Sequence, residues 1–261
     1  MRLRAKRLRA ELMFETLPAA LAERARQTPH EPWLFYRRGW DWQWYSWRQV
    51  ADLVARGAEN AQLGETELFA PPPLTPDAVA TTLAIQTAGA TASPKATNLL
   101  EMPSFRTHLE RYEPQIPESR AQANDDAFPG VTHAQLAAAA AEISADLSAL
   151  APAKNRDILA FSPSLAAARH GEIHREWLAW CLASGAAWAL EDEPEAFLVA
   201  ALWARPTLIV ATGRELDVLG NDLKQRKYRR WHRLRAVLAV DSESISTTWD
   251  TLGIAALRLK R

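Results

Sequence analysis

The chain has 261 residues, 48% hydrophobic and 24% charged, so it is long enough to bury one large core or two small ones. Lysine plus arginine equals aspartate plus glutamate at 31 each, which gives no electrostatic reason to expect DNA as a partner. The single cysteine, Cys181, excludes an internal disulfide framework and a cysteine-based zinc site, and its apolar neighbours indicate a buried thiol. No apolar run reaches the roughly 18 residues of a transmembrane helix, so we expect a cytoplasmic protein.

The N-terminal residues 1–15 are strongly basic and are predicted to form an arm or the start of an amphipathic helix. They lack the apolar core of a secretory signal, and their charge would also suit peripheral contact with an acidic membrane surface. Caps and hydrophobic spacing then predict a helix over 16–29, a β-hairpin over 33–47 and a helix over 47–64.

Residues 65–130 contain most of the irregular sequence. A proline-rich loop over 65–76 precedes a helix of small residues over 77–90. Residues 95–130 hold four prolines and no hydrophobic period, so they are predicted to form a long irregular surface loop.

From residue 131 onward, predicted helices and strands alternate. The helices cover 131–150, 170–185, 194–206 and 214–231, the last being one helix or a pair of helices. The buried strands cover 157–164, 186–191, 207–213 and 234–240. Such alternation predicts an α/β fold with mostly parallel, layered sheets flanked by helices. Residues 16–261 would form a single domain, or two subdomains over 16–94 and 131–261 joined by the irregular loop 95–130.

The order of several short motifs resembles one enzyme family. The segments "VTHAQL", "RDILAFSPSL", "EWLAWCLASGAAWAL" and "ALWARPTLIVATGRELDVL" resemble, in sequence order, the large N-terminal domain of adenylate-forming (AMP-binding) acyl-CoA synthetases, the long-chain type in particular. "TLPAALAERARQTPHEPWLFY" and "YSWRQVADLVARGAENAQLG" resemble the opening of that domain. The resemblance implies a shortened large domain, and we expect the family's small C-terminal domain with the catalytic lysine, which would lie beyond Arg261, to be absent.

The stretch "TAGATASPKA" resembles the family's phosphate-binding loop without its working groups. Thr87, Gly89, Thr91 and Lys95 stand in register, whereas alanines occupy other glycine and hydroxyl positions. In one interpretation the true loop, which should directly precede Thr132-His133, is deleted and this stretch mimics it by accident. In the other, it is the loop, separated from Thr132-His133 by an insertion. Either way the amides and hydroxyls that phosphates need are reduced, and a degenerate enzyme is expected.

Two further departures from the family support degeneracy, and we predict no catalytic residues. The family's P-L-x-H turn is "PSLA" here, and no aromatic-Gly-x-Thr-Glu motif follows "AVLAV". The remaining candidates for a ligand pocket are residues at a helix start, at a strand's carboxyl end and among tryptophans: Thr132, His133, Ser162, Pro163, Ser164, Trp177 and Trp180. His133 could instead be structural, and the tryptophans, with Trp188 and Trp203, could pack in a core rather than line an acyl tunnel.

Two other sequence patterns could mark a binding site, but each also has a purely structural explanation. His170 and His174 share a helical face and could hold a metal, although a solvated helix start also explains them, so no metal site is predicted. Residues 224–235 are basic with interleaved aromatics, which suits phosphate or RNA or simply a charged helix face. The candidate patch is Lys224, Arg226, Lys227, Arg229 and Arg230.

The sequence therefore leads to three functional hypotheses. The first is a catalytically silent acyl-CoA synthetase-like protein that binds a fatty acyl group, an acyl carrier protein, a full-length synthetase or a second copy of itself, with no cofactor. The second is a minimal or split adenylating enzyme completed by another chain, which would need ATP and Mg²⁺. The third is a phosphate- or RNA-binding module acting through residues 224–235.

Overall fold

A computed structural model describes residues 14–38, 41–61, 66–71, 74–102, 115–150, 156–167, 171–191, 193, 197, 204–226, 233–240 and 247–259. The chain divides into two compact units, each made of separate segments. Unit 1 comprises Met1–Trp33, Trp44–Ser144 and Glu172–Gly185, and unit 2 comprises Leu34–Gln43, Ala145–Gly171 and Ala186–Arg261. The described part of the expected linker 95–130 thus belongs to unit 1.

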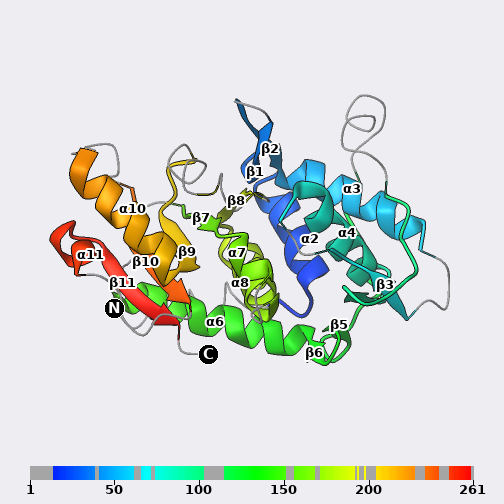
Figure 1. The fold of residues 1–261 in the computed structure, drawn as a ribbon. Helices are drawn as coiled ribbons and strands as arrows, with labels where there is room; N and C mark the ends of the chain where they lie inside the picture. The colour runs from blue at the N-terminus through cyan, green and yellow to red at the C-terminus, as the bar shows by residue number, and fades with distance from the viewer. Residues whose placement is uncertain are drawn as a thin grey trace, which may run out of the picture. The chain divides into compact units, whose positions relative to one another are not determined.

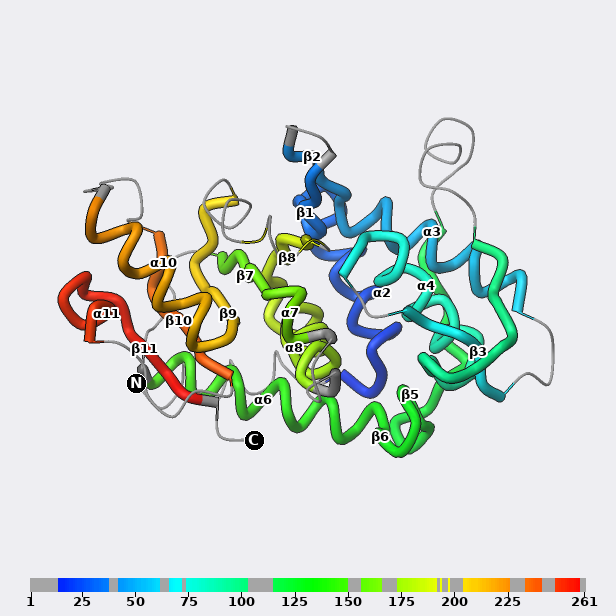
Figure 2. Tube along the Cα trace, viewed as in Figure 1, coloured from blue at the N-terminus to red at the C-terminus, as the bar shows by residue number. Residues whose placement is uncertain are grey.

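Unit 1 is mainly helical. Its helices are α2 (Leu17–Gln27), α3 (Trp47–Glu59), α4 (Pro76–Thr87), the first part of α6 (His133–Leu150) and α8 (Gly171–Ser184). Hydroxyl side chains begin the first three: Thr16, Ser46 and Thr75 each accept a hydrogen bond from the backbone three residues on. Helices α3 and α4 lie side by side (Figure 2).

Two short strand pairs complete unit 1. Strands β3 (Glu67–Phe69) and β4 (Thr91–Ser93) pair in parallel, and β5 (Asp126–Phe128) and β6 (Val131–Thr132) pair antiparallel. The predictions were wrong here: β3 lies in the segment expected to be a proline loop, and β5 lies at the end of the expected irregular loop. Each of these two strands has only three residues, which is too short for a hydrophobic period to be visible in the sequence.

Unit 2 is built on a seven-stranded sheet with the order β11-β10-β9-β7-β8-β1-β2 (Figure 1). The strands are β1 (Pro32–Arg38), β2 (Asp41–Ser46), β7 (Ile158–Phe161), β8 (Ala187–Leu190), β9 (Leu208–Thr212), β10 (Ala236–Val240) and β11 (Ala255–Leu259). Every pairing from β11 through to β1 is parallel. The four strands predicted from apolar runs are confirmed, as is the α/β class with a mostly parallel sheet; β11 was not predicted.

The order of the strands creates a switch point in the sheet. After β7 the chain forms β8 on one side, and it then crosses to form β9 on the other side of β7. In open α/β sheets, ligands bind outside the carboxyl ends of the strands at such a point. Here that position is the carboxyl end of β7 and β9.

Helices α7 (Ser164–Ala167), α10 (Gly213–Arg226) and α11 (Thr248–Thr251) accompany the sheet. Gly220 of α10 lets Trp249 of α11 approach closely, because a Cβ atom there would lie 3.2 Å from the indole ring. Trp249 is fully buried in an apolar cluster with residues of β9 and β10. The predicted helix over 194–206 falls largely outside the described residues, and so does the end of the predicted helix over 47–64.

Among the described residues, none of the helices combines the length and the apolar character that a membrane crossing requires.

Candidate functional site

The loop-like stretch from Thr87 to Lys95 forms the end of a helix, a turn and a strand. The Thr87 hydroxyl donates to the Leu83 carbonyl at 2.7 Å, within α4. Gly89 has a φ of +84° and ends the helix, and Thr91 pairs with Glu67 in the β3–β4 ladder.

The backbone amides of this stretch are already used. Those of residues 88, 89 and 90 donate to carbonyls within α4, and that of residue 91 donates to the Thr66 carbonyl at 2.8 Å. The Lys95 amide donates to the Ser93 hydroxyl at 3.2 Å, and the Lys95 side chain is exposed. A phosphate group needs a run of amides that point outward together, and this stretch does not present one.

A tight hairpin stands directly ahead of Thr132-His133, where the family's phosphate loop is expected. Phe128 of β5 faces Val131 of β6, so only Pro129 and Gly130 connect the two strands. Gly130 has a φ of +71°, which suits a tight turn. Two residues leave no backbone with which to surround a triphosphate.

Thr132 and His133 both serve helix starts. Thr132 begins α6 with a reciprocal pair of hydrogen bonds to Gln135, in which its hydroxyl accepts at 3.2 Å and its amide donates at 2.8 Å. Nδ1 of His133 accepts a hydrogen bond from the Leu17 amide, the first of α2, at 3.2 Å. Burial lowers the pKa of His133 to about 4, with an opposing effect from Asp125, so the imidazole is neutral at pH 7.

One residue of α8 contacts the hairpin. The Arg175 guanidinium lies 4.5 Å from the centre of the Phe128 ring, a cation–π contact that occupies the face of that ring. His174 is buried, and burial together with the nearby Arg175 lowers its pKa to about 4. His170 lies outside the described residues, and among those described no cluster of three or more His, Cys, Asp or Glu could hold a metal.

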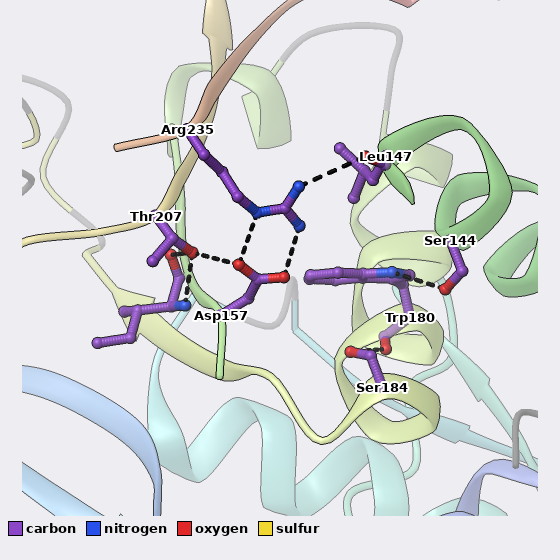
Figure 3. Close-up of polar contacts among 8 residues, drawn as sticks. Ser144, Leu147, Asp157, Trp180, Ser184, Thr207 and Arg235 are labelled. Carbon is purple, nitrogen blue, oxygen red and sulfur yellow. Dashed lines mark hydrogen bonds and ion pairs between the residues drawn. The ribbon is translucent and has the colours of Figure 1, made fainter. Parts of the chain in front are cut away.

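The two tryptophans of the candidate pocket pack inside unit 1. Trp177 and Trp180 make an edge-to-face contact at 5.3 Å between ring centres, and both are at most 2% exposed. The Trp180 indole donates to the Ser144 hydroxyl at 3.0 Å, and Ser184 donates to the Trp180 carbonyl at 2.7 Å (Figure 3). Trp203 lies outside the described residues.

Ser162, Pro163 and Ser164 lie in unit 2, at the carboxyl end of β7 and hence at the switch point. The Ser162 and Ser164 hydroxyls both donate to Oε1 of Glu215, at 2.7 and 2.9 Å. Oε2 of Glu215 accepts from the amide and the hydroxyl of Thr212, at 2.9 and 2.8 Å. One carboxylate therefore joins the ends of β7 and β9 to the start of α10.

Sequence reasoning missed Glu215 and Thr212. The pattern "TGRE" at 212–215 is the capping-box signature, in which a threonine begins a helix and a glutamate three residues later bonds back to it. That signal predicts the Thr212–Glu215 pair. The contribution from β7 depends on the strand order, which the pattern does not contain.

The opposite, amino ends of the same strands are held by an ion pair. Arg235 donates to Asp157 through Nε at 2.8 Å and through Nη2 at 2.6 Å, and the Thr207 hydroxyl donates to Asp157 at 2.7 Å (Figure 3). These three residues precede β10, β7 and β9 respectively. Arg235 also reaches the Leu147 carbonyl of α6 at 3.5 Å. This cluster ties strands together and lies away from the switch point.

The carboxyl ends of β8 and β1 carry a second ionic group. Arg37 pairs with Glu191 and with Glu193, each at 3.2 Å. Glu191 is buried and Glu193 is exposed. The described residues at this edge of the sheet carry charges of both signs, since Arg214 at the start of α10 and Arg258 at the end of β11 accompany Glu193 and Glu215.

The predicted basic patch is only partly described. Lys224 and Arg226 lie in the last turn of α10, and Lys224 is exposed. Lys227, Arg229 and Arg230 lie outside the described residues. Of the candidate pocket, Thr132, His133, Trp177 and Trp180 belong to unit 1, and residues 162–164 belong to unit 2.

Comparison of the fold with solved structures finds adenylate-forming enzymes. The chain is similar to CmiS6, with a TM-score of 0.62 and 17% identity over 95% of this chain and 71% of that one. It is similar to a long-chain-fatty-acid-CoA ligase from Archaeoglobus fulgidus, with a TM-score of 0.66 and 13% identity over 92% of this chain and 60% of that one. It is also similar to the nonribosomal peptide synthetase FmoA3 in its AMPPNP-bound form, with a TM-score of 0.68 and 15% identity over 92% of this chain and 31% of that one.

No family model matches the sequence, and no curated protein matches it either. The chain spans between about a third and about two thirds of the length of most of these neighbours. At these identities the likeness establishes the fold: this chain has the fold of part of an adenylate-forming enzyme.

Proposed function

We propose that the protein is a catalytically degenerate relative of the acyl-CoA synthetases, which retains their scaffold and acts by binding rather than by adenylation. The observation that carries the proposal is the hairpin from Phe128 to Val131. ATP phosphates require a run of backbone N–H groups that a ligand can approach, and a two-residue turn supplies too few.

The alternative position for the loop also fits ATP poorly. The amides from residue 88 to residue 91 donate to backbone carbonyls, and the Thr87 hydroxyl is bonded within its own helix. Neither place suits the phosphates of a nucleoside triphosphate, so we propose no ATP-dependent reaction. The protein would need no cofactor.

The binding site we propose is the carboxyl end of β7 and β9. Ser162 and Ser164 lie there at the switch point, where the fold class binds ligands. Serine hydroxyls can both donate to and accept from an uncharged, amide-containing group. A fatty acyl chain or the pantetheine arm of an acyl carrier protein has that character; a full-length synthetase or a second copy of this chain are the other proposed partners.

The test of catalytic silence is a pyrophosphate-release assay with ATP, Mg²⁺ and a panel of fatty acids, run beside an active long-chain acyl-CoA ligase. We expect no turnover above that of the buffer. Fatty-acid-dependent release of pyrophosphate would refute the proposal.

The test of the site is a fluorescence titration with acyl-pantetheine and acyl carrier protein. Ser164→Ala should weaken binding several-fold, whereas the control Ser148→Ala, on an exposed position of α6, should leave it unchanged. Equal affinities for the two variants would exclude this site.

The minimal or split adenylating enzyme is the second proposal, and it requires ATP and Mg²⁺. Calorimetric titration separates the two, because a split enzyme must show ATP affinity in this chain. A phosphate- or RNA-binding module is the third. It predicts salt-dependent binding that is lost when Arg229 and Arg230 become alanine.

A further inference from the structure

Helix α4 carries two buried polar groups that form no hydrogen bond with the described residues. The Thr82 hydroxyl and the Gln86 carbonyl oxygen make no hydrogen bond with any described residue, and the two side chains are 1% and 0% exposed. Buried polar groups are almost always bonded to protein or to ordered water, so these two call for a partner.

The two groups lie close enough to share one. Thr82 and Gln86 are four residues apart, so they occupy the same face of α4 with Cβ atoms about 5–6 Å apart. The Gln86 amide is fixed at its nitrogen end, which donates to the Ala127 carbonyl of β5 at 2.9 Å. Its oxygen accepts no hydrogen bond from the described residues and is left as an acceptor.

Neighbouring threonines show that Thr82 is exceptional. The Thr81 hydroxyl donates to the Asp77 carbonyl at 2.8 Å, and the Thr87 hydroxyl donates to the Leu83 carbonyl at 2.7 Å. This bond to the preceding turn is the ordinary way to satisfy a threonine in a helix. Thr82 does not use it, so its hydroxyl is available to another partner.

We propose that one internal water molecule bridges the Thr82 hydroxyl and the Gln86 carbonyl oxygen. A buried water makes two to four hydrogen bonds, and it can accept from the threonine while donating to the glutamine. Leu83 and Ile85, their neighbours on α4, are fully buried, so the two polar groups lie in an apolar interior.

This water would position β5. By fixing the Gln86 oxygen, it holds the amide in the orientation that bonds Ala127, one residue before Phe128 and the hairpin turn. The proposed absence of adenylation rests on this hairpin, but the water site is independent of that proposal, since it predicts stability and not activity.

The test combines a crystal structure of the full chain, at a resolution that shows ordered waters, with thermal unfolding of variants. We expect density within hydrogen-bond distance of both atoms. Thr82→Val should lower the melting temperature by about 3–8 °C, because the water and Gln86 lose a partner. Thr82→Ser, which keeps the hydroxyl, should lower it by less than half as much.

The control is Thr81→Val, the same change one residue away at a hydroxyl bonded within the helix. Gln86→Met combined with Thr82→Val should lower the melting temperature by less than the sum of the single changes, since both remove the same bridge. Absence of density, together with equal shifts for Thr81→Val and Thr82→Val, would overturn the inference. If Thr82→Val fails to fold, the wild-type density and Thr82→Ser decide the question.

Discussion

Replacing Glu215 tests whether its carboxylate holds the carboxyl ends of β7 and β9 together. The Glu215 carboxylate accepts four hydrogen bonds, two from Ser162 and Ser164 and two from Thr212. Glu215→Ala removes all four and leaves the fully buried Ser162 hydroxyl without its acceptor. Glu215→Gln keeps an acceptor for Thr212, and its amide can donate to the serine hydroxyls after they rotate.

The expected losses in the free energy of unfolding follow from the hydrogen bonds that each change removes. Loss of the helix cap costs about 1 kcal/mol. Each hydroxyl bond to a carboxylate contributes about 1.5–3 kcal/mol, reduced because a released hydroxyl can turn to another acceptor. We therefore expect Glu215→Ala to lower the free energy of unfolding by about 4 kcal/mol and Glu215→Gln by about 1–2 kcal/mol.

The assay is urea unfolding followed by tryptophan fluorescence, with far-ultraviolet circular dichroism as a second probe. Asp217→Ala, on an exposed position of the same helix, is the matched control and should change stability by less than about 0.5 kcal/mol. If Glu215→Ala and Glu215→Gln prove equal, or if both match the control, the carboxylate does not hold the strand ends together.

Three further predictions concern stability. Both His133 and His174 have a folded-state pKa of about 4, below the unfolded value of 6.5, so their contribution is complete above pH 6.5 and is lost as the pH falls to 4, by about 3 kcal/mol each. His133→Asn should reduce that dependence in urea titrations between pH 7.5 and 4.5, and an unchanged slope contradicts the assignment. Asp157→Ala should cost about 3 kcal/mol, because it leaves the Arg235 guanidinium, whose side chain is only 15% exposed, without its carboxylate partner. A simultaneous Arg235→Met should recover part of this loss, and no recovery would argue against the ion pair. Gly185→Ala should cost about 1–2 kcal/mol in calorimetry, since its φ is +73° and the guanidinium of Arg24, which donates to the Leu182 and Ala183 carbonyls at the end of α8, lies 3.1 Å from the new Cβ; a neutral result would mean that the turn relaxes.

The parallel sheet could be predicted from sequence because its strands are short apolar runs between helices. "ILAF", "LIVAT" and "AVLAV" are buried on both faces, and a continuous apolar run bounded by polar residues is typical of a strand covered on both sides. The pair β3 and β4 could not be predicted, because "ELF" and "TAS" carry no period. Their pairing joins Glu67 to Thr91 across a helix.

The candidate site, like the sheet, was only partly predictable from the sequence. The carboxyl end of β7 was recognisable as a place for polar residues, and Ser162 and Ser164 do lie at the switch point. Their bonding partner depends on β9 lying beside β7 although β8 comes between them in sequence. A local pattern predicts the Thr212–Glu215 cap, and only the strand order brings the serines to it.

The hairpin before His133 has a turn that costs little to close. A long loop between β5 and β6 would carry a closure entropy that grows with its length, whereas a two-residue turn keeps that cost small. The turn is supported by Arg175 over Phe128 and by Gln86 on Ala127, and neither contact requires a bound phosphate. Since activity resides in sites and not in folds, the serine–glutamate cluster at the switch point is where a ligand should be sought.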